Sequence, residues 1–390
     1  MRKKLKDVCM FYSGTGFPIQ YQGQTKGEYP FYKVGDIANN AIAGKIYLEL
    51  CNNYIFSDVA KMIKGCILPK DTVVFAKIGE ALKLNRRAIT SCDCLIDNNA
   101  MGIAPKLDSL RIQYFYFCMK NLKMQTLAES TTVPSVRKTV LEKYEIEVPS
   151  LVEQEEIEKK LTLTQKIIEK RRQELSYLDE IIKARFVEMF GDPVANDKGW
   201  KMKPLLDMGK CKNGMNFHYD DSGVEISCLG VGDFKDLSVI DNTKKLSIVS
   251  LNEMPSEEYL LKDGDIVFVR SNGNKDLVGR SLAIYPGKLP TTFSGFCIRY
   301  RIHDDEITVP YLLRVLKMES MRKKMAGRGA NIQNLNQQIL GTLVIPVPPI
   351  ELQNQFVDFV RAIDKSKVAV QKALDETQIL FDSLMQKYFG

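Results

Sequence analysis

Apolar residues recur every seven positions in two stretches of the chain, with charged and amide side chains between them. The first stretch carries Leu161, Ile168, Leu175, Ile182 and Met189, and the second carries Val360, Leu374, Phe381 and Tyr388. The first stretch has no proline or glycine from position 151 until Gly191 closes it. The second has none from position 350 until Gly390. This pattern predicts two helices of about 60 Å each. The heptad spacing predicts that they pack against each other.

The two stretches belong to one duplicated unit. The same residue type recurs 199 positions after Pro149, Gln154 and Gly191, so the two stretches align without a gap. Upstream, VGDI at 34–37 matches VGDF at 231–234, and LPKDTVVFAK from Leu68 matches LKDGDIVFVR from Leu261. The chain is therefore predicted to read domain, helix, domain, helix.

We place the boundaries of this duplication at the prolines before the helices and at the turn-rich join GDPVANDKGW. The segments are a globular domain over 1–150, a helix over 151–191, a second domain over 192–349 and a helix over 350–390. Short strand-like runs and amphipathic helices without regular βαβ alternation predict an α+β fold with two similar mixed α/β domains. Antiparallel packing of two equal helices as a coiled coil implies pseudo-two-fold symmetry.

Composition adds less than the repeat does. The 390 residues are 45% hydrophobic, which suffices for packed cores, and the net charge of +7 favours a polyanionic partner only slightly. No apolar run approaches the roughly 18 residues that a membrane span needs. Nine cysteines, an odd number, fit reduced thiols better than a disulfide framework. We therefore expect a cytoplasmic protein with no membrane contact.

Motifs for catalysis and metal binding are missing from the sequence. Pro348-Pro349 is followed by Ile350 rather than by the aromatic residue of an adenine methyltransferase motif, and no glycine-rich loop ends in Gly-Lys-Ser/Thr. His218 and His303 are the two histidines, and Cys92 and Cys94 have no second pair at zinc spacing. We expect a non-catalytic protein with no metal and no cofactor of its own.

The repeated architecture resembles a known family. Each half ends in a Val-Pro, a glutamine-bearing segment (VPSLVEQEEI, VPPIELQNQF), a long helix and a Phe-Gly, with FGDPVANDKGW between the halves. This order, over essentially the whole chain, is similar to that of the DNA-specificity subunit of type I restriction-modification systems. One departure is that Gln353 lacks the acidic residues that follow Gln154, so a subunit contact there could differ.

The resemblance implies a function in DNA recognition. Each domain would be a target-recognition domain that reads one half of a bipartite sequence in double-stranded DNA, and the helices would act as a spacer. Such subunits recruit two methyltransferase subunits, which use S-adenosylmethionine, and in a larger complex restriction/translocase subunits. Two alternatives stay open: a recognition partner of a fused restriction-methylation enzyme, and a coiled-coil scaffold whose domains bind protein.

Two polar loops in each domain are candidate DNA contacts, because arginine pairs with guanine, asparagine or glutamine pairs with adenine, and lysine and serine hold phosphate. The loops after the repeated Val-Phe run contain Lys77, Lys83, Asn85, Arg86 and Arg87 in the first domain and Arg270, Ser271, Asn272, Asn274, Lys275 and Arg280 in the second. The patches before the last strand contain Thr132, Ser135, Arg137 and Lys138, and Arg328, Asn331, Gln333, Asn334 and Asn336.

Turn formation and helix capping explain several of these residues equally well. A basic helix is expected to hold phosphate or to lie in solvent; its cations are Arg314, Lys317, Arg322, Lys323 and Lys324. The loops SGTG from Ser13 and KNG from Lys212 are weaker candidates, and the glycines of the first predict a turn rather than a nucleotide-binding loop.

Overall fold

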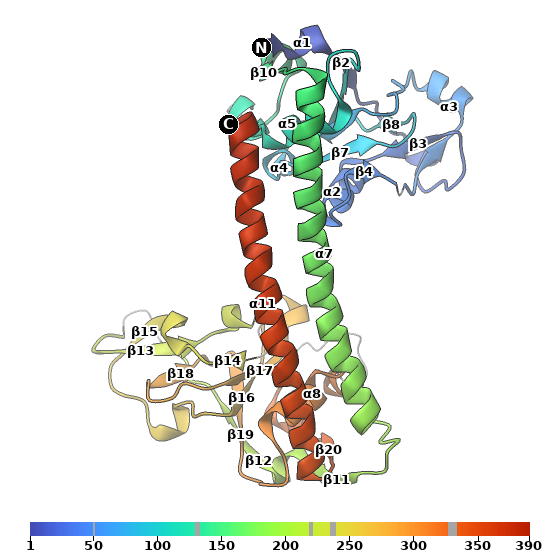
Figure 1. Cartoon of the computed structure of the whole chain (residues 1–390). Coiled ribbons are helices and arrows are strands. Elements are labelled where there is room, and N and C mark those ends of the chain that lie inside the picture. Colours follow the sequence, from blue (N-terminus) through green and yellow to red (C-terminus); the bar gives the residue numbers. More distant parts are fainter. Residues whose placement is uncertain (50, 129–132, 218–220, 235–238, 327–333) are drawn as a thin grey trace. The chain divides into compact units, whose positions relative to one another are not determined.

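The computed structural model describes the chain except residues 50, 129–132, 218–220, 235–238 and 327–333 (Figure 1). It divides into two compact units, which are described separately below. Unit 1 comprises Met1–Leu175 and Val370–Gly390, and unit 2 comprises Ser176–Ala369. Each unit therefore contains one globular domain, the beginning of one long helix and the end of the other.

Three sheets form the domain of unit 1. The five-stranded sheet has the order β2 (Cys9–Ser13), β9 (Ala100–Pro105), β6 (Val73–Ala76), β7 (Arg87–Thr90) and β4 (Tyr47–Leu48). The smaller sheets are β5 (Tyr54–Ile55), β3 (Tyr29–Tyr32) and β8 (Leu95–Ile96), and the pair β1 (Arg2–Lys4) and β10 (Glu145–Glu147). Strand pairs are antiparallel apart from β4 with β7 and β3 with β8. The five-stranded sheet therefore mixes parallel and antiparallel pairs.

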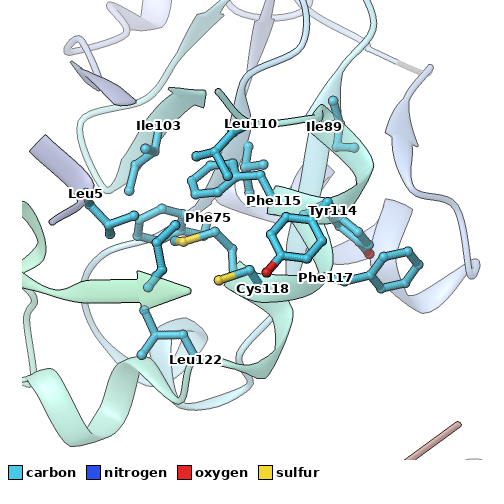
Figure 2. Close-up of a cluster of buried hydrophobic side chains, with 14 of the residues drawn as sticks. Leu5, Phe75, Ile89, Ile103, Leu110, Tyr114, Phe115, Phe117, Cys118 and Leu122 are labelled. Atoms are coloured by element: carbon cyan, nitrogen blue, oxygen red, sulfur yellow. The ribbon is translucent and has the colours of Figure 1, made fainter. Parts of the chain in front are cut away.

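The short α-helices in the described part of this domain are α1 (Leu5–Val8), α2 (Val34–Ile42), α3 (Ser57–Met62), α4 (Glu80–Lys83), α5 (Ile112–Asn121) and α6 (Lys138–Lys143). Helix α5 packs against β7 and buries every side chain from Tyr114 to Met119. Figure 2 shows Phe115 and Cys118 of α5 in one cluster with Phe75 and Ile103 of the sheet. This apolar cluster is the main core of the unit.

Unit 2 repeats the same strand order. Its five-stranded sheet runs β12 (Gly209–Asn213), β19 (Cys297–Ile302), β16 (Asp265–Val269), β17 (Ser281–Ile284) and β14 (Val239–Ile240). The others are β15 (Ser247–Leu251), β13 (Val224–Leu229) and β18 (Thr291–Phe293), and β11 (Lys201–Pro204) with β20 (Val344–Val347). Its helices include α8 (Val309–Lys317), α9 (Glu319–Ala326) and α10 (Gln337–Gly341).

The ladder register shows which residues of the two domains correspond. Phe75 of β6 faces Arg87 of β7, and Phe268 of β16 faces Ser281 of β17. Two positions before these phenylalanines, Val73 of β6 pairs with β9 and Ile266 of β16 pairs with β19, again at matched positions. The duplication predicted from the sequence is thus confirmed at the level of individual strand pairs.

The long helices are α7 (Leu151–Phe190) and α11 (Ile350–Phe389), each of 40 residues (Figure 1). In unit 1 the first half of α7 shares a core with the second half of α11, through residues that include Leu161, Ile168, Leu374 and Phe381. In unit 2 the end of α7 meets the start of α11, where the Phe186 and Phe356 rings lie 5.4 Å apart. The helix segments within each unit are therefore antiparallel, whereas a coiled coil continuous along both helices stays a prediction.

Each long helix also ends on an aromatic contact. Phe190 of α7 lies 4.8 Å from Tyr311 in unit 2, and Phe389 of α11 lies 5.3 Å from Tyr114 in unit 1. Helix α7 stops because Gly191 adopts a φ of 75°, a conformation that favours glycine. Within the described part of the chain, neither these helices nor any shorter one has the length and apolar character of a membrane span.

One buried glutamine anchors the start of each long helix. The Gln154 Nε2 donates to the Ser109 and Pro149 carbonyls, both at 2.9 Å, and its Oε1 accepts from the Arg111 N–H at 2.8 Å. In the same way, the Gln353 Nε2 donates to the Glu306 carbonyl at 2.8 Å and to the Pro348 carbonyl at 2.9 Å, and its Oε1 accepts from the Thr308 N–H at 2.9 Å. Both side chains are fully buried. The repeated Pro-to-Gln spacing of the sequence therefore reflects one structural joint, used twice.

Candidate nucleic-acid interface

The structure brings together the two loops that the sequence singles out in each domain. In unit 1 the Lys77 carbonyl accepts from the Val136 N–H at 2.9 Å, and the Gly79 N–H donates to the Pro134 carbonyl at 2.9 Å. In unit 2 the Arg270 carbonyl accepts from the Leu335 N–H at 2.8 Å. Val136 and Leu335 occupy matched positions, so one backbone joint holds both loops side by side in each domain.

The side chains at this joint differ between the domains. Lys77 and Ser135 are half-buried and Arg137 is exposed. In unit 2 their counterparts are Arg270, Asn334 and Asn336. The Arg270 Nη1 donates to the Gly295 carbonyl at 3.4 Å, Asn334 is exposed, and the Asn336 side chain caps α10 by accepting from the Ile339 N–H at 2.8 Å. A lysine and serine on one scaffold thus correspond to an arginine and asparagine on the other.

The loop from Ser271 to Arg280 is shaped by its own polar side chains. The Asn272 Oδ1 accepts from the Asn274 N–H at 2.7 Å, and the Asn274 Oδ1 accepts from the Asp276 N–H at 3.1 Å. The Arg280 Nε donates to the Asp276 carbonyl at 3.2 Å. Turn formation, the alternative that the sequence leaves open, therefore accounts for part of this asparagine-rich stretch.

The corresponding loop of unit 1 contains a buried arginine. Arg87 is only 3% exposed, and its guanidinium donates to the Asn85 Oδ1 at 2.7 Å and to the Leu122 carbonyl at 3.2 Å. Asn85 has a φ of 52° and donates to the Lys120 carbonyl at 3.1 Å. Lys83 is exposed and pairs with Glu80 at 2.6 Å. Asn85 and Arg87 therefore tie the loop to α5, and their predicted contact with DNA stays a prediction.

Several predicted contacts remain without a structural description. Thr132, Arg328, Asn331 and Gln333 lie outside the described residues, as does the side chain of Lys275. Lys138 is exposed, 3.7 Å from the Glu142 carboxylate and 5.9 Å from the centre of the Phe11 ring. Lys138 is therefore a surface residue already engaged with its own domain.

Basic side chains surround a cavity in unit 1, and two of them, Lys120 and Arg172, are not among the candidates drawn from the sequence. The cavity has a volume of 340 Å³, and its lining includes Arg86, Arg87, Lys120 and Arg172. Burial lowers the pKa of Arg87 to about 9 and also lowers the pKa of Lys120. With a pKa near 9 the Arg87 guanidinium keeps its charge at neutral pH. Lys120 was identifiable from the sequence, because it lies 197 residues before Lys317 of the basic helix.

The basic stretch of unit 2 forms a comparable cluster, but it is two helices, α8 and α9, and not the single helix that the sequence predicts, because α8 ends at Lys317 and Met318 adopts an extended conformation. Arg314 and Lys317 lie on α8 and Arg322 lies on α9. The pKa of Lys317 is lowered to about 8. Burial is the larger cause, and repulsion from Arg314, Arg280 and Arg322 adds to it. These four cations therefore influence one another, and Arg280, predicted as a DNA contact, belongs to the same cluster as the helix.

The glycine loops have a packing role. A Cβ added at Gly14 would lie 1.7 Å from the Asp97 carbonyl oxygen, and one at Gly214 would lie 2.1 Å from the Ser294 carbonyl oxygen. Both loops therefore need glycine for close backbone approach. In the described part of the chain, histidine, cysteine, aspartate and glutamate side chains form no group of three or more that could hold a metal ion.

Comparison with known proteins identifies a family for both domains. The family model for the type I restriction modification DNA specificity domain matches residues 1–177 and 197–377. These two matches cover most of the chain, one for each copy of the repeat.

Two curated relatives are specificity subunits. The type I restriction enzyme StySPI specificity subunit of Salmonella potsdam is 25% identical over 291 residues, which cover 68% of this chain and 61% of that protein. The type I restriction enzyme MjaIX specificity subunit of Methanocaldococcus jannaschii is 23% identical over 415 residues, covering 99% of this chain and 91% of that protein. The match to the Salmonella protein thus spans about three fifths of its length.

Solved structures share the fold. The S subunit of a type I restriction-modification system from M. genitalium matches with a TM-score of 0.54 and 15% identity, covering 100% of this chain and 96% of that one. A chain from a structure on complex assembly and conformational transition of the type I restriction-modification system matches with a TM-score of 0.56 and 15% identity, covering 100% and 97%.

Proposed function

Because the chain belongs to the family of type I restriction modification DNA specificity domains, we propose that it is the subunit that reads a bipartite sequence in double-stranded DNA, with one domain for each half-site. The observation that carries this proposal is the duplicated domain. Both copies keep the same strand order, and both hold the same two loops together through one backbone joint. A retained scaffold with different loop side chains favours two recognition units with different specificities.

The joint between the loops is the proposed place of base reading. Lys77 corresponds to Arg270, Ser135 to Asn334 and Arg137 to Asn336. Arginine and lysine pair with guanine in the major groove, and asparagine pairs with adenine. Because these chemistries differ at matched positions, the two half-sites should differ in sequence. Arg87 and Asn85 are left out of this proposed contact set, since both are engaged inside unit 1.

The long helices are the proposed spacer and assembly platform. Antiparallel contacts within each unit favour a coiled coil with pseudo-two-fold symmetry, which would present the domains to the duplex in inverted orientation. Helices of about 60 Å match on the order of 17 base pairs. Two methyltransferase subunits, and restriction/translocase subunits in a larger complex, would bind this platform in the cytoplasm. Methyl transfer and cleavage would then reside in those subunits, with no catalytic site in this chain.

The test is a pair of matched substitutions, Lys77→Ala and Arg270→Ala. Each should relax base preference in one half-site, a different half for each variant, because loss of a good base contact costs about 1 to 3 kcal/mol. The measurement is selection of bound sequences from a random duplex pool with the full chain. Lys6→Ala and Lys288→Ala, which alter exposed lysines on other surfaces, are the controls. Changes in the same half, or in neither half, contradict one domain per half-site.

A further inference from the structure

Among the described residues of unit 1, the buried Arg87 guanidinium has no carboxylate as a hydrogen-bond partner. The partners of the Arg87 guanidinium are the Arg86 carbonyl, the Asn85 amide oxygen and the Leu122 carbonyl, and its Nε is buried without a hydrogen-bond partner. None of these partners is a carboxylate. Burial of an uncompensated charge is unfavourable, so a counter-anion beside it would be stabilising.

The cavity next to Arg87 has an excess of positive charge. Its lining includes five cationic residues, Lys45, Arg86, Arg87, Lys120 and Arg172, and two carboxylates, Glu169 and Asp382. Lys45 pairs with the Glu49 carboxylate at 2.6 Å, which leaves four cations against two carboxylates. Both carboxylates accept hydrogen bonds from neutral amides, Glu169 from Gln165 at 3.1 Å and Asp382 from Gln378 at 3.0 Å. The Lys120 Nζ lies over the Tyr116 and Phe381 rings at 5.9 and 5.4 Å. The site is therefore built to attract an anion.

Unit 2 places an arginine at the same junction but on a different element. The strand register matches Arg87 of β7 with Ser281 of β17. On the helix that packs against this strand, the register matches Phe117 of α5 with Arg314 of α8. The Arg314 Nε and Nη2 are buried without hydrogen-bond partners. Each domain thus has an arginine with buried, unpartnered guanidinium nitrogens beside the matched lysine, Lys120 or Lys317. Arg314 differs from Arg87 in that the carboxylates of Asp179 and Glu180 lie near enough to favour its charge. The repetition points to a requirement for positive charge at this place rather than for one particular side chain.

We propose that the cavity beside Arg87 and Lys120 binds a phosphate group, and that the phosphate belongs to the DNA backbone. Guanidinium and ammonium groups are the usual phosphate ligands in proteins. The site would hold the duplex independently of its sequence, next to the loops that read bases. This inference rests on the proposed function, which it deepens by assigning a second, non-specific contact to unit 1.

The experiment compares Lys120→Met and Arg86→Gln with Lys170→Met in the full chain. Lys170 is exposed on α7 and does not line the cavity. Affinity is measured across a salt series for the selected target duplex and for a scrambled duplex. Loss of one phosphate contact should weaken binding of both duplexes about tenfold and reduce the slope of log affinity against log salt by about 0.9. Lys170→Met should bind like the wild type, and unfolding curves establish that each variant is folded.

The outcomes separate this inference from the proposed function. If wild-type chain does not prefer its selected target over the scrambled duplex, the proposed function is wrong. If both cavity variants keep wild-type affinity and salt slope, the phosphate site on DNA is wrong. Binding of inorganic phosphate to the DNA-free chain, followed by ³¹P line broadening, distinguishes the source: variants that lose inorganic phosphate but keep DNA affinity would overturn the assignment to the DNA backbone.

Discussion

At the scale of single residues, burial gives polar side chains roles that their sequence neighbours do not reveal. Arg86 and Arg87 are adjacent, yet Arg87 is almost fully buried and ties its loop to α5, whereas Arg86 is half-buried and lines the cavity. Lys120 and Lys317 are matched lysines whose pKa values are both lowered by burial. Burial of such charged groups reduces the stability of the folded protein.

Lys317 leads to a prediction about pH. Its pKa falls from 10.5 to about 8 on folding, so between these values the unfolded chain binds more protons and the free energy of unfolding rises with pH. At pH 7 the charged lysine costs the fold at most about 3 kcal/mol. Lys317→Met should therefore be more stable than wild type at pH 7, and the difference should shrink by about 1 kcal/mol at pH 9.

Urea unfolding at the two pH values measures this effect. Lys365→Met, which alters an exposed lysine on α11, should change stability little at either pH. A stability difference between Lys317→Met and wild type that is the same at pH 7 and pH 9 would show that the lysine charge is not the cause.

At the scale of elements, the start of each long helix is set by a side chain from inside the helix. Helix α7 also has a reciprocal cap, in which the Glu153 carboxylate accepts from the Ser150 N–H at 2.8 Å and the Glu153 N–H donates to the Ser150 hydroxyl at 3.3 Å. Helix α11 lacks that pair of residues, because Pro349 and Leu352 occupy the positions of Ser150 and Glu153. The buried glutamine is thus the anchor common to both helices.

Replacing this glutamine should loosen the joint without emptying the space that it fills. Gln154→Met leaves the Ser109 carbonyl and the Arg111 N–H buried without their partner. We therefore expect the free energy of unfolding to fall by at least about 2 kcal/mol. Gln353→Met should have a similar effect in unit 2 through the Thr308 N–H. Amide hydrogen exchange reports each site directly: Arg111 should lose protection in the first variant and Thr308 in the second.

The matched control is Gln173→Met, because Gln173 is exposed on α7. It should leave stability and both amides unchanged. Wild-type protection of Arg111 in Gln154→Met would mean that the glutamine does not hold the helix to the domain.

At the scale of the whole molecule, duplication is the main organising fact. The two sheets of five strands have the same order, and the family model matches both halves. Each unit combines the beginning of one long helix with the end of the other. Because the end of each long helix belongs to the unit of the other repeat, each half of the chain depends on the other half for a complete apolar core.

If the helices set the spacing between half-sites, their length should set the unread gap in the target. Four residues inserted after Leu175 in α7 and after Ala369 in α11, where the units divide, add about 6 Å to each helix. At about 3.4 Å per base pair this lengthens the gap by about two base pairs. Selection of bound duplexes by the doubly extended chain measures the new gap.

Insertion into α7 alone is the control, since it shifts one helix against the other and should weaken sequence-specific binding. Retention of the original gap by the doubly extended chain would remove the spacer role from the helices.

The sequence by itself determined the order domain, helix, domain, helix, because a register of 199 residues and a seven-residue apolar period are local or repetitive signals. It also singled out the loops around Lys77 and Arg270. Only the tertiary structure decided that those loops are joined to the segments at Val136 and Leu335. It also decided that Arg87 is buried and that Arg86, Lys120 and Arg172 line one cavity. Such relations depend on where distant parts of the chain meet, and periodicity along the chain carries no information about that.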